Sequence, residues 1–266
     1  MTKDSLSDLL ARMQPAGAGF TAPIPERWTQ GRTTFGGLTA ALMLQAAMRE
    51  QPDLPPLRSA LIGFTAPVTE PPLLTSQVLR RGRNVTTIEA RAQIGEQVVC
   101  TGNFSFGAAQ QSSINVIHNA PPATPPEQTM QMIPPEAVDM APGFHKNFDI
   151  RLIEGDRPMS GSNRPYIRAW ARHKDPASQS GIVSLLCLAD ILPPAVFPMF
   201  PRPGPNSSMS WICNFLTDAP QTKDGWWHVE TSSVTAHGGY SSQVMRMWNS
   251  EGELMVEGMQ SVVVFV

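Results

Sequence analysis

Asp190 is the residue whose type and position most suggest chemistry. It stands near the end of residues 182–192, where nine of eleven residues are apolar and only Ser184 and Asp190 interrupt them. An ionised carboxylate at the end of an apolar helix loses hydration and also faces the negative end of the helix dipole. Asp190 is therefore a candidate general base, unless it turns outward and caps the loop before Pro193-Pro194.

Gln260 is a polar residue on an apolar strand face. Alternation places residues 254, 256, 258, 260, 262 and 264 on one side of the last strand, and only residue 260 among them is polar. A buried amide needs hydrogen-bond partners, so Gln260 either bonds the neighbouring backbone or holds a reactant. In the first half of the chain Ala46 and Phe104 stand in register with Asp190 and Gln260, so only the second half carries the polar pair.

Three consecutive hydroxyls, Thr231, Ser232 and Ser233, follow a strand that begins at residue 226. Such runs are typical of solvent-facing strand ends. Alternation with Trp227 favours Thr231 or Ser233 as inward-facing, and a β-bulge would shift that register. The pattern leaves the choice among the three open.

Other catalytic and binding motifs are incomplete. The glycines of residues 31–37 have P-loop spacing, but Gly37 and Leu38 stand where Lys and Ser or Thr are required. No G-x-S-x-G or C-x-x-C motif occurs, and the five histidines have no paired metal-ligand spacing. We therefore expect no metal and no cofactor.

Composition narrows the class of protein. The formal net charge is −2 and only 16% of residues are charged, which disfavours nucleic acid and membrane surfaces as partners. No apolar run reaches the roughly 18 residues of a membrane helix. Charged residues interrupt the N-terminal leucines, and the three cysteines are an odd number inside apolar runs. These features predict a cytoplasmic protein with reduced core thiols.

Around these residues the sequence predicts two similar sets of helices and strands, in an α+β fold. Residues 38–48 and 182–192 predict two buried helices, each preceded by a glycine, and leucines at helical spacing in residues 6–13 predict a short amphipathic opening helix. Seven prolines and no periodicity make residues 107–146 a linker between units 1–106 and 147–266. Strands are expected near residues 57–64, 73–81, 85–93, 97–106, 148–152, 166–172, 209–215, 226–233, 240–249 and 253–266.

Taken together, these segments resemble the type II acyl-CoA thioesterases. That family is a double hotdog, in which two tandem units each have a long central helix wrapped by a curved antiparallel sheet. The similarity covers nearly the whole chain outside the linker. The matching motifs are Phe35-Gly-Gly with Leu-Thr-Ala-Ala-Leu-Met-Leu-Gln-Ala-Ala, Arg80-Arg-Gly-Arg-Asn-Val-Thr-Thr, Leu188-Ala-Asp-Ile-Leu-Pro, Val229-Glu-Thr-Ser-Ser, and Gly252-Glu-Leu-Met-Val-Glu-Gly-Met-Gln.

The resemblance implies which residues do the chemistry. In the family an Asp at the helix end, a Thr or Ser on the following sheet and a Gln on the last strand hold and activate a water. Carried over by motif, these are Asp190, Ser232 and Gln260. A shift of one residue would instead select Thr231 or Ser233.

The resemblance also implies a hydrolase of acyl-CoA thioesters in lipid metabolism, with acyl-CoA as its substrate and activated water as the nucleophile. Gly36 and Gly37 would bind the substrate, because backbone N–H groups at a helix start can stabilise an oxyanion. We expect a homo-oligomer formed through sheet or helix-face packing. The alternatives are a hotdog enoyl-CoA hydratase or dehydratase, which usually pairs Asp with His, and a noncatalytic acyl-CoA or lipid-binding hotdog protein.

Overall fold

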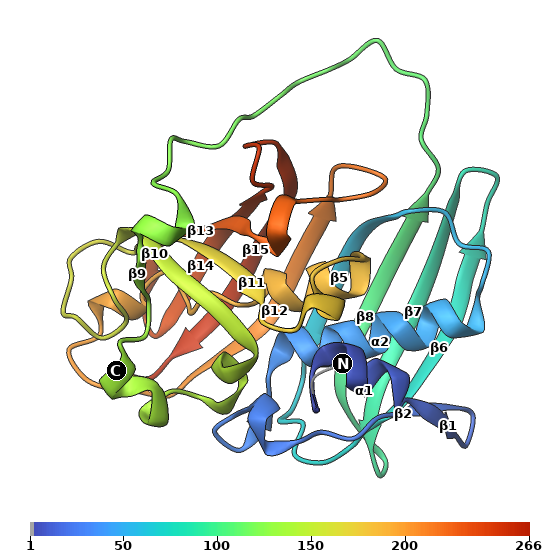
Figure 1. Ribbon diagram of the computed structural model, residues 1–266. Helices are drawn as coiled ribbons and strands as arrows, with labels where there is room; N and C mark the ends of the chain where they lie inside the picture. The colour runs from blue at the N-terminus through green and yellow to red at the C-terminus, as the bar shows by residue number, and fades with distance from the viewer. Residues whose placement is uncertain (1–2) are drawn as a thin grey trace.

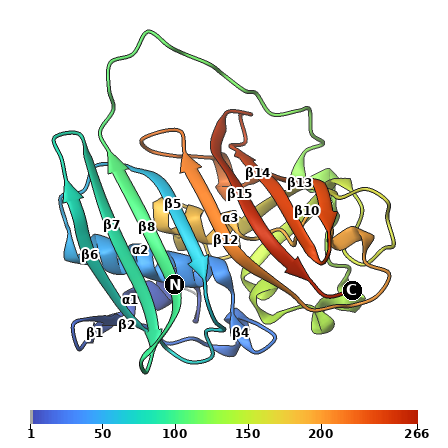
Figure 2. The ribbon, with the colours of Figure 1, turned by 180° about the vertical axis from the view of Figure 1, so that it is seen from behind.

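One antiparallel sheet runs through the molecule and carries two helices on one face (Figure 1). The computed structural model describes residues 3–266. Figure 2, the view from behind, shows the opposite face of the sheet with the helices beyond it. In the order in which they pair, the strands are β1 (Gln14–Ala16), β2 (Gly19–Thr21), β6 (Leu73–Arg81), β7 (Val85–Ile94), β8 (Gln97–Gly107), β5 (Leu57–Phe64), β12 (Asn206–Phe215), β15 (Leu254–Val264), β14 (Tyr240–Trp248), β13 (Trp227–His237), β11 (Tyr166–His173), β10 (Phe148–Gly155) and β9 (Met130–Gln131).

The same strand order occurs on both sides of the junction between β5 and β12. The four strands after the long helix of the first half pair in the order β6-β7-β8-β5, and the four after that of the second half pair in the order β13-β14-β15-β12. In each set, the first strand after the central helix pairs with the last. The ten strands predicted from the sequence are all present, with ends that differ by up to four residues.

Helix α2 (Gly36–Glu50) is the long helix of the first half and is apolar on nearly every side. It packs against α3 (Ile182–Ala189) and against β6, β7 and β8. Ten of its fifteen residues are buried. The apolar run that predicted residues 38–48 as a buried helix is confirmed, and the helix extends by two residues at each end.

Helix α3 is shorter than its apolar run predicted, because the sequence after Asp190 cannot continue a helix. The predicted range was 182–192, but the helix ends at Ala189 and Asp190 is its C-cap, with φ −91° and ψ 10°. Pro193 and Pro194 lack the N–H groups that helical bonds would use, and a proline also disfavours helical geometry at the residue before it. Asp190 therefore leaves the helix axis and turns toward α2.

Alternation along the strands directs one face of the sheet toward the helices. Residues that pair directly across antiparallel strands share a face. One row on the helix-facing side crosses β5, β12, β15 and β14 through the buried residues Ile62, Trp211, Gln260 and Gln243. Polar side chains therefore occur inside an otherwise apolar layer, and only in the second half of this row.

Helix α1 (Leu6–Ala11) confirms the predicted amphipathic opening helix. Its N-cap is Ser5, whose hydroxyl accepts a hydrogen bond from the Asp8 backbone N–H at 3.3 Å. Leu6 and Leu9 are fully buried. An N-cap hydroxyl of this kind stabilises a helix by about 1 kcal/mol.

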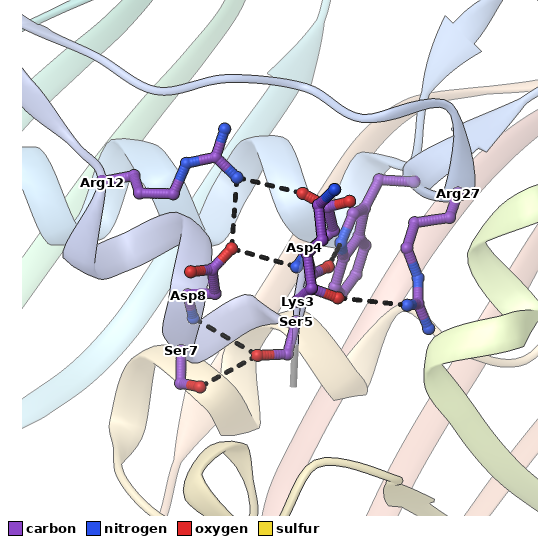
Figure 3. Close-up of polar contacts among 8 residues, drawn as sticks. Lys3, Asp4, Ser5, Ser7, Asp8, Arg12 and Arg27 are labelled. Atoms are coloured by element: carbon purple, nitrogen blue, oxygen red, sulfur yellow. Dashed lines mark hydrogen bonds and ion pairs between the residues drawn. The ribbon is translucent and has the colours of Figure 1, made fainter. Parts of the chain in front are cut away.

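Polar contacts hold the start of the chain against the rest of the molecule (Figure 3). The Arg12 guanidinium donates to Asp4 at 3.0 Å and to Asp8 at 3.1 Å. Both ion pairs are exposed to solvent, so each contributes little to stability. The Ser7 hydroxyl donates to Asp175 at 2.6 Å, which attaches α1 to the second half of the chain.

The segment between the two halves crosses from the end of β8 to the β14–β15 turn, and Figure 1 shows it arching away from the sheet. Its first part is highly exposed, with 88% of Val116 accessible. The segment then contacts the sheet. The indole N–H of Trp248 donates a hydrogen bond to the His118 carbonyl at 3.2 Å, and the indole N–H of Trp170 donates to the Thr124 carbonyl at 2.8 Å. Within residues 3–266, no helix has the length and apolar character needed to cross a membrane.

Candidate active site

Asp190 lies where the end of α3 meets the start of α2. The backbone N–H of Gly37 donates a hydrogen bond to the Asp190 carboxylate. A Cβ atom on Gly36 would lie 2.8 Å from Oδ2 of Asp190, and one on Gly37 would lie 2.3 Å from the Cys187 carbonyl oxygen. The two helices can approach this closely only because α2 begins with two glycines. The structure therefore brings Gly36 and Gly37 together with Asp190.

Gln260 of β15 joins Asp190 to a hydroxyl that the sequence did not indicate. Its Nε2 donates to Oδ1 of Asp190 at 3.0 Å and to Oγ of Ser208 at 2.9 Å. Its Oε1 accepts a hydrogen bond from Nε2 of Gln243 at 2.6 Å. Gln260 is 4% exposed, so its amide is fixed by protein groups rather than by bulk water.

A β-bulge in β12 is the reason that Ser208 faces the site. Ser208 pairs with Val262, but Ser210 pairs with Ser261, so Met209 is an extra residue in the strand. Without the bulge, Ser208 would alternate to the face opposite Trp211. No signal in the sequence marks the bulge, and the predicted strand started at residue 209, so Ser208 was not among the candidates.

The hydroxyl run at residues 231–233 lies away from Asp190. Ser232 pairs with Val244, which in turn pairs with Met259, and this row lies on the outer face of the sheet. The structure therefore does not bring Ser232 together with Asp190 and Gln260. The expected grouping of Ser232 with those two residues is corrected, since strand alternation directs its side chain outward.

Thr231 and Ser233 do face inward, but neither bonds the Asp190 group in the described part of the chain. The Ser233 hydroxyl donates to the Ser242 carbonyl at 2.7 Å and is 8% exposed. Thr231 pairs with Met245 on the neighbouring strand and is fully buried, and its hydroxyl has no hydrogen-bond partner among residues 3–266. The order of inward and outward side chains therefore follows the alternation with Trp227.

Burial controls the charge of Asp190. Desolvation raises the pKa of Asp190 from 3.8 to about 7, and hydrogen bonds from Gln260 and from the Gly37 backbone N–H offset part of the rise. The positive end of the α2 dipole also favours the carboxylate. Near neutral pH, Asp190 can therefore both release and accept a proton, as a general base must.

Three buried thiols feel the charge of Asp190. Cys100, Cys187 and Cys213 are unpaired and buried, which confirms the predicted core thiols. Burial raises the pKa of the Cys100 thiol to about 12 and raises the pKa values of the Cys187 and Cys213 thiols well above 9. The negative charge of Asp190 adds to each of these rises. Protonated thiols are poor nucleophiles, so these cysteines act as apolar packing.

The three buried histidines are neutral and take no part in the Asp190 group. Burial lowers the pKa values of His145, His173 and His228 to about 4. The imidazole of His173 bonds the Ser184 carbonyl at 2.9 Å. Among residues 3–266, no histidine bonds Asp190, and no cluster of three or more His, Cys, Asp or Glu could hold a metal ion.

The arrangement can fix and deprotonate a small polar molecule. A carboxylate with a pKa near neutrality, one hydroxyl and one amide converge at the start of a helix whose first N–H groups can donate hydrogen bonds. Residues from both halves contribute, since the glycines belong to the first and Asp190, Ser208 and Gln260 to the second.

Comparisons with known proteins agree with this arrangement. The family model described as the acyl-CoA thioesterase C-terminal domain matches residues 119–264, and that described as the N-terminal domain matches residues 24–107. No curated protein has a significant sequence match to the chain.

Solved structures with low sequence identity share the fold. A protein of unknown function with a hotdog fold from Alicyclobacillus acidocaldarius is 22% identical, with a TM-score of 0.86 and 98% of each chain covered. The tesB protein of Mycobacterium avium subspecies paratuberculosis is 19% identical, with a TM-score of 0.77, and the match covers 98% of this chain and 100% of that protein's chain. An acyl-CoA thioesterase II from Mycobacterium marinum is 19% identical, with a TM-score of 0.74 and 98% of each chain covered. The chain therefore has the hotdog fold.

Proposed function

Because the chain belongs to the acyl-CoA thioesterase family, we propose that it hydrolyses an acyl-CoA thioester to a free acid and CoA, with water as the nucleophile. The observation that carries this proposal is the group formed by Asp190, Gln260 and Ser208 at the start of α2. A thioester carbonyl needs a positioned water, a base for its proton and donors for the developing oxyanion. Asp190 supplies the base, Ser208 and Gln260 hold the water, and the N–H groups at the start of α2 supply the donors.

In the proposed reaction, Asp190 accepts a proton from the water as the water oxygen bonds to the thioester carbonyl carbon. Ser208 and Gln260 hold that water without changing their own charge. The carbonyl oxygen gains negative charge near the backbone N–H groups of the first turn of α2, which begins at Gly36. The C–S bond then breaks, and the CoA sulfur takes the proton from Asp190. The hydroxyl role that the family motif gave to Ser232 passes to Ser208 in this scheme.

We further infer that the chain consists of two hotdog units, residues 1–106 and 147–266, joined by a linker at 107–146. The matching order of the four strands that follow each central helix supports this division. Ala46 stands in α2 where Asp190 stands after α3, so the proposed chemistry has one site per chain.

The first experiment measures thiol release from acyl-CoAs with short, medium, long and aromatic acyl groups. We expect turnover by the wild type and a loss of about 100-fold or more in kcat for Asp190→Asn and Gln260→Ala, because positioned acid–base groups contribute on that order. No turnover of any substrate would refute the proposal and favour a noncatalytic acyl-CoA-binding protein.

The hydroxyl assignment is tested with matched serine variants. Ser208→Ala is expected to lower kcat, whereas Ser207→Ala, at the exposed neighbouring position, and Ser232→Ala, on the outer face, should leave kcat unchanged. A large loss in Ser232→Ala with full activity in Ser208→Ala would reverse the assignment.

A further inference from the structure

Gln243 is a buried amide one strand away from the proposed site. It lies on β14 directly opposite Gln260 of β15, and only 1% of it is exposed. Its Oε1 accepts a hydrogen bond from the backbone N–H of Ala195 at 2.7 Å, and its Nε2 donates to Oε1 of Gln260 at 2.6 Å. Gln243 therefore links Gln260 to the turn that follows Asp190.

The polarity of these bonds is fixed by a single backbone group. A backbone N–H can only donate, so the Gln243 amide must turn its oxygen toward Ala195. Its NH2 group must then point toward Gln260, which has to present its own oxygen in return. The NH2 group of Gln260 is consequently left for Asp190 and Ser208.

We propose that Gln243 is a positioning residue, which holds the Gln260 amide in the orientation that donates to Asp190 and Ser208. This inference rests on the proposed function, and it assigns a role to a residue that does not itself touch the proposed water. A rotated Gln260 would place its oxygen against the carboxylate, where two acceptors repel each other, and Asp190 would ionise less readily.

The orientation also sets the direction of the Ser208 hydroxyl. Because Gln260 donates to Oγ of Ser208, that oxygen serves as an acceptor. The Ser208 hydrogen has no protein acceptor among the bonds of residues 3–266, so it is available to a water or to the thioester oxygen. One backbone N–H thus determines, through two glutamines, how the hydroxyl is presented to the reactants.

Within the described residues, no other charge competes for control of Asp190. The titratable groups that feel its charge are the thiols of Cys100 on β8, Cys187 on α3 and Cys213 on β12, and burial keeps all three protonated and uncharged. A change in the pH dependence of Gln243→Met, which adds no charge, therefore reports on the amide chain rather than on a neighbouring ion.

The test replaces Gln243 with Met, which has nearly the same shape but forms neither hydrogen bond. We expect Gln243→Met to lower kcat about 100-fold, the order of loss that a misplaced reacting group causes, with KM changed by less than about threefold. The acid limb of the kcat profile should move to higher pH. Gln243→Glu adds a second variant, because an ionised carboxylate can accept from Ala195 but cannot donate to Gln260. Gln97→Glu, at an exposed position on β8, is the matched control.

A folded Gln243→Met protein with wild-type kcat and an unmoved acid limb would overturn the inference, while turnover by the wild type would leave the proposed function intact. A readout without turnover is the side-chain amide resonances of Gln260, observed by 15N NMR. In the wild type they should shift as Asp190 titrates, and in Gln243→Met the shift should be lost. An unchanged titration in the variant would refute the positioning role even if no acyl-CoA is hydrolysed.

Discussion

Replacing Asp190 with Asn should stabilise the folded protein at alkaline pH. Burial raises the pKa of Asp190 from 3.8 to about 7, so the folded state binds this proton more tightly than the unfolded state does. For a raised pKa, the stabilising contribution is fully present below pH 3.8 and is lost as the pH rises through about 7. The amide of the Asp190→Asn variant carries no charge at any pH and escapes that loss.

The size of the effect follows from the shift. A difference of about three pKa units between the two states corresponds to about 4 kcal/mol of unfolding free energy above pH 8. Typical domains have an unfolding free energy of only about 5–15 kcal/mol, so ionisation of Asp190 lowers the stability of the folded protein by a sizeable fraction.

The assay is urea unfolding of the wild type and of Asp190→Asn at one-unit steps from pH 4 to pH 9. Comparing the two proteins at each pH cancels the contributions of all other carboxylates. The difference in unfolding free energy should be small near pH 4, grow through pH 5 to 7 and level off above pH 8. A difference that stays constant across this range would contradict the raised pKa of Asp190, because it would mean that the folded and unfolded pKa values are the same.

The remaining predictions concern packing and thiol access. Gly37→Ala should destabilise the fold by at least about 1–3 kcal/mol in urea titrations, since its Cβ would lie 2.3 Å from the Cys187 carbonyl oxygen and would force the two helices apart. Gly36→Ala should fold but lose thioesterase activity, because its Cβ would displace Oδ2 of Asp190 at 2.8 Å; full activity would contradict this. The three buried thiols should react with a thiol reagent only after denaturation, and reaction in the native state would contradict their burial. Ser5→Ala should cost about 1 kcal/mol in unfolding free energy, and no change would show that this cap is dispensable.

The elements were predictable where one physical signal dominated. An apolar run has to be buried, so both central helices were found, and alternation located the ten long strands. The short strands β1, β2 and β9 have no pattern of their own, because two or three residues are too few to show one. The end of α3 was predicted too late, since Ile191 and Leu192 continue the apolar run after the helix has stopped.

The candidate site was predictable only in part. Asp190 and Gln260 interrupt apolar patterns, and such interruptions can be read from a sequence. Ser208 interrupts nothing, because it faces inward only through the bulge at Met209, which depends on pairing with β15. Ser232 was selected from a motif match, and strand alternation directs it outward.

The pairing of β5 with β12 has a consequence for how the two halves come together. Because the proposed linker at residues 107–146 ties them, they meet at an effective concentration of the order of millimolar, whatever the concentration of the protein. Two halves produced as separate chains would instead meet as a bimolecular complex that dissociates on dilution. Since the glycines at the start of α2 and the carboxylate after α3 come from different halves, dilution would then take the site apart, which it cannot do to the continuous chain.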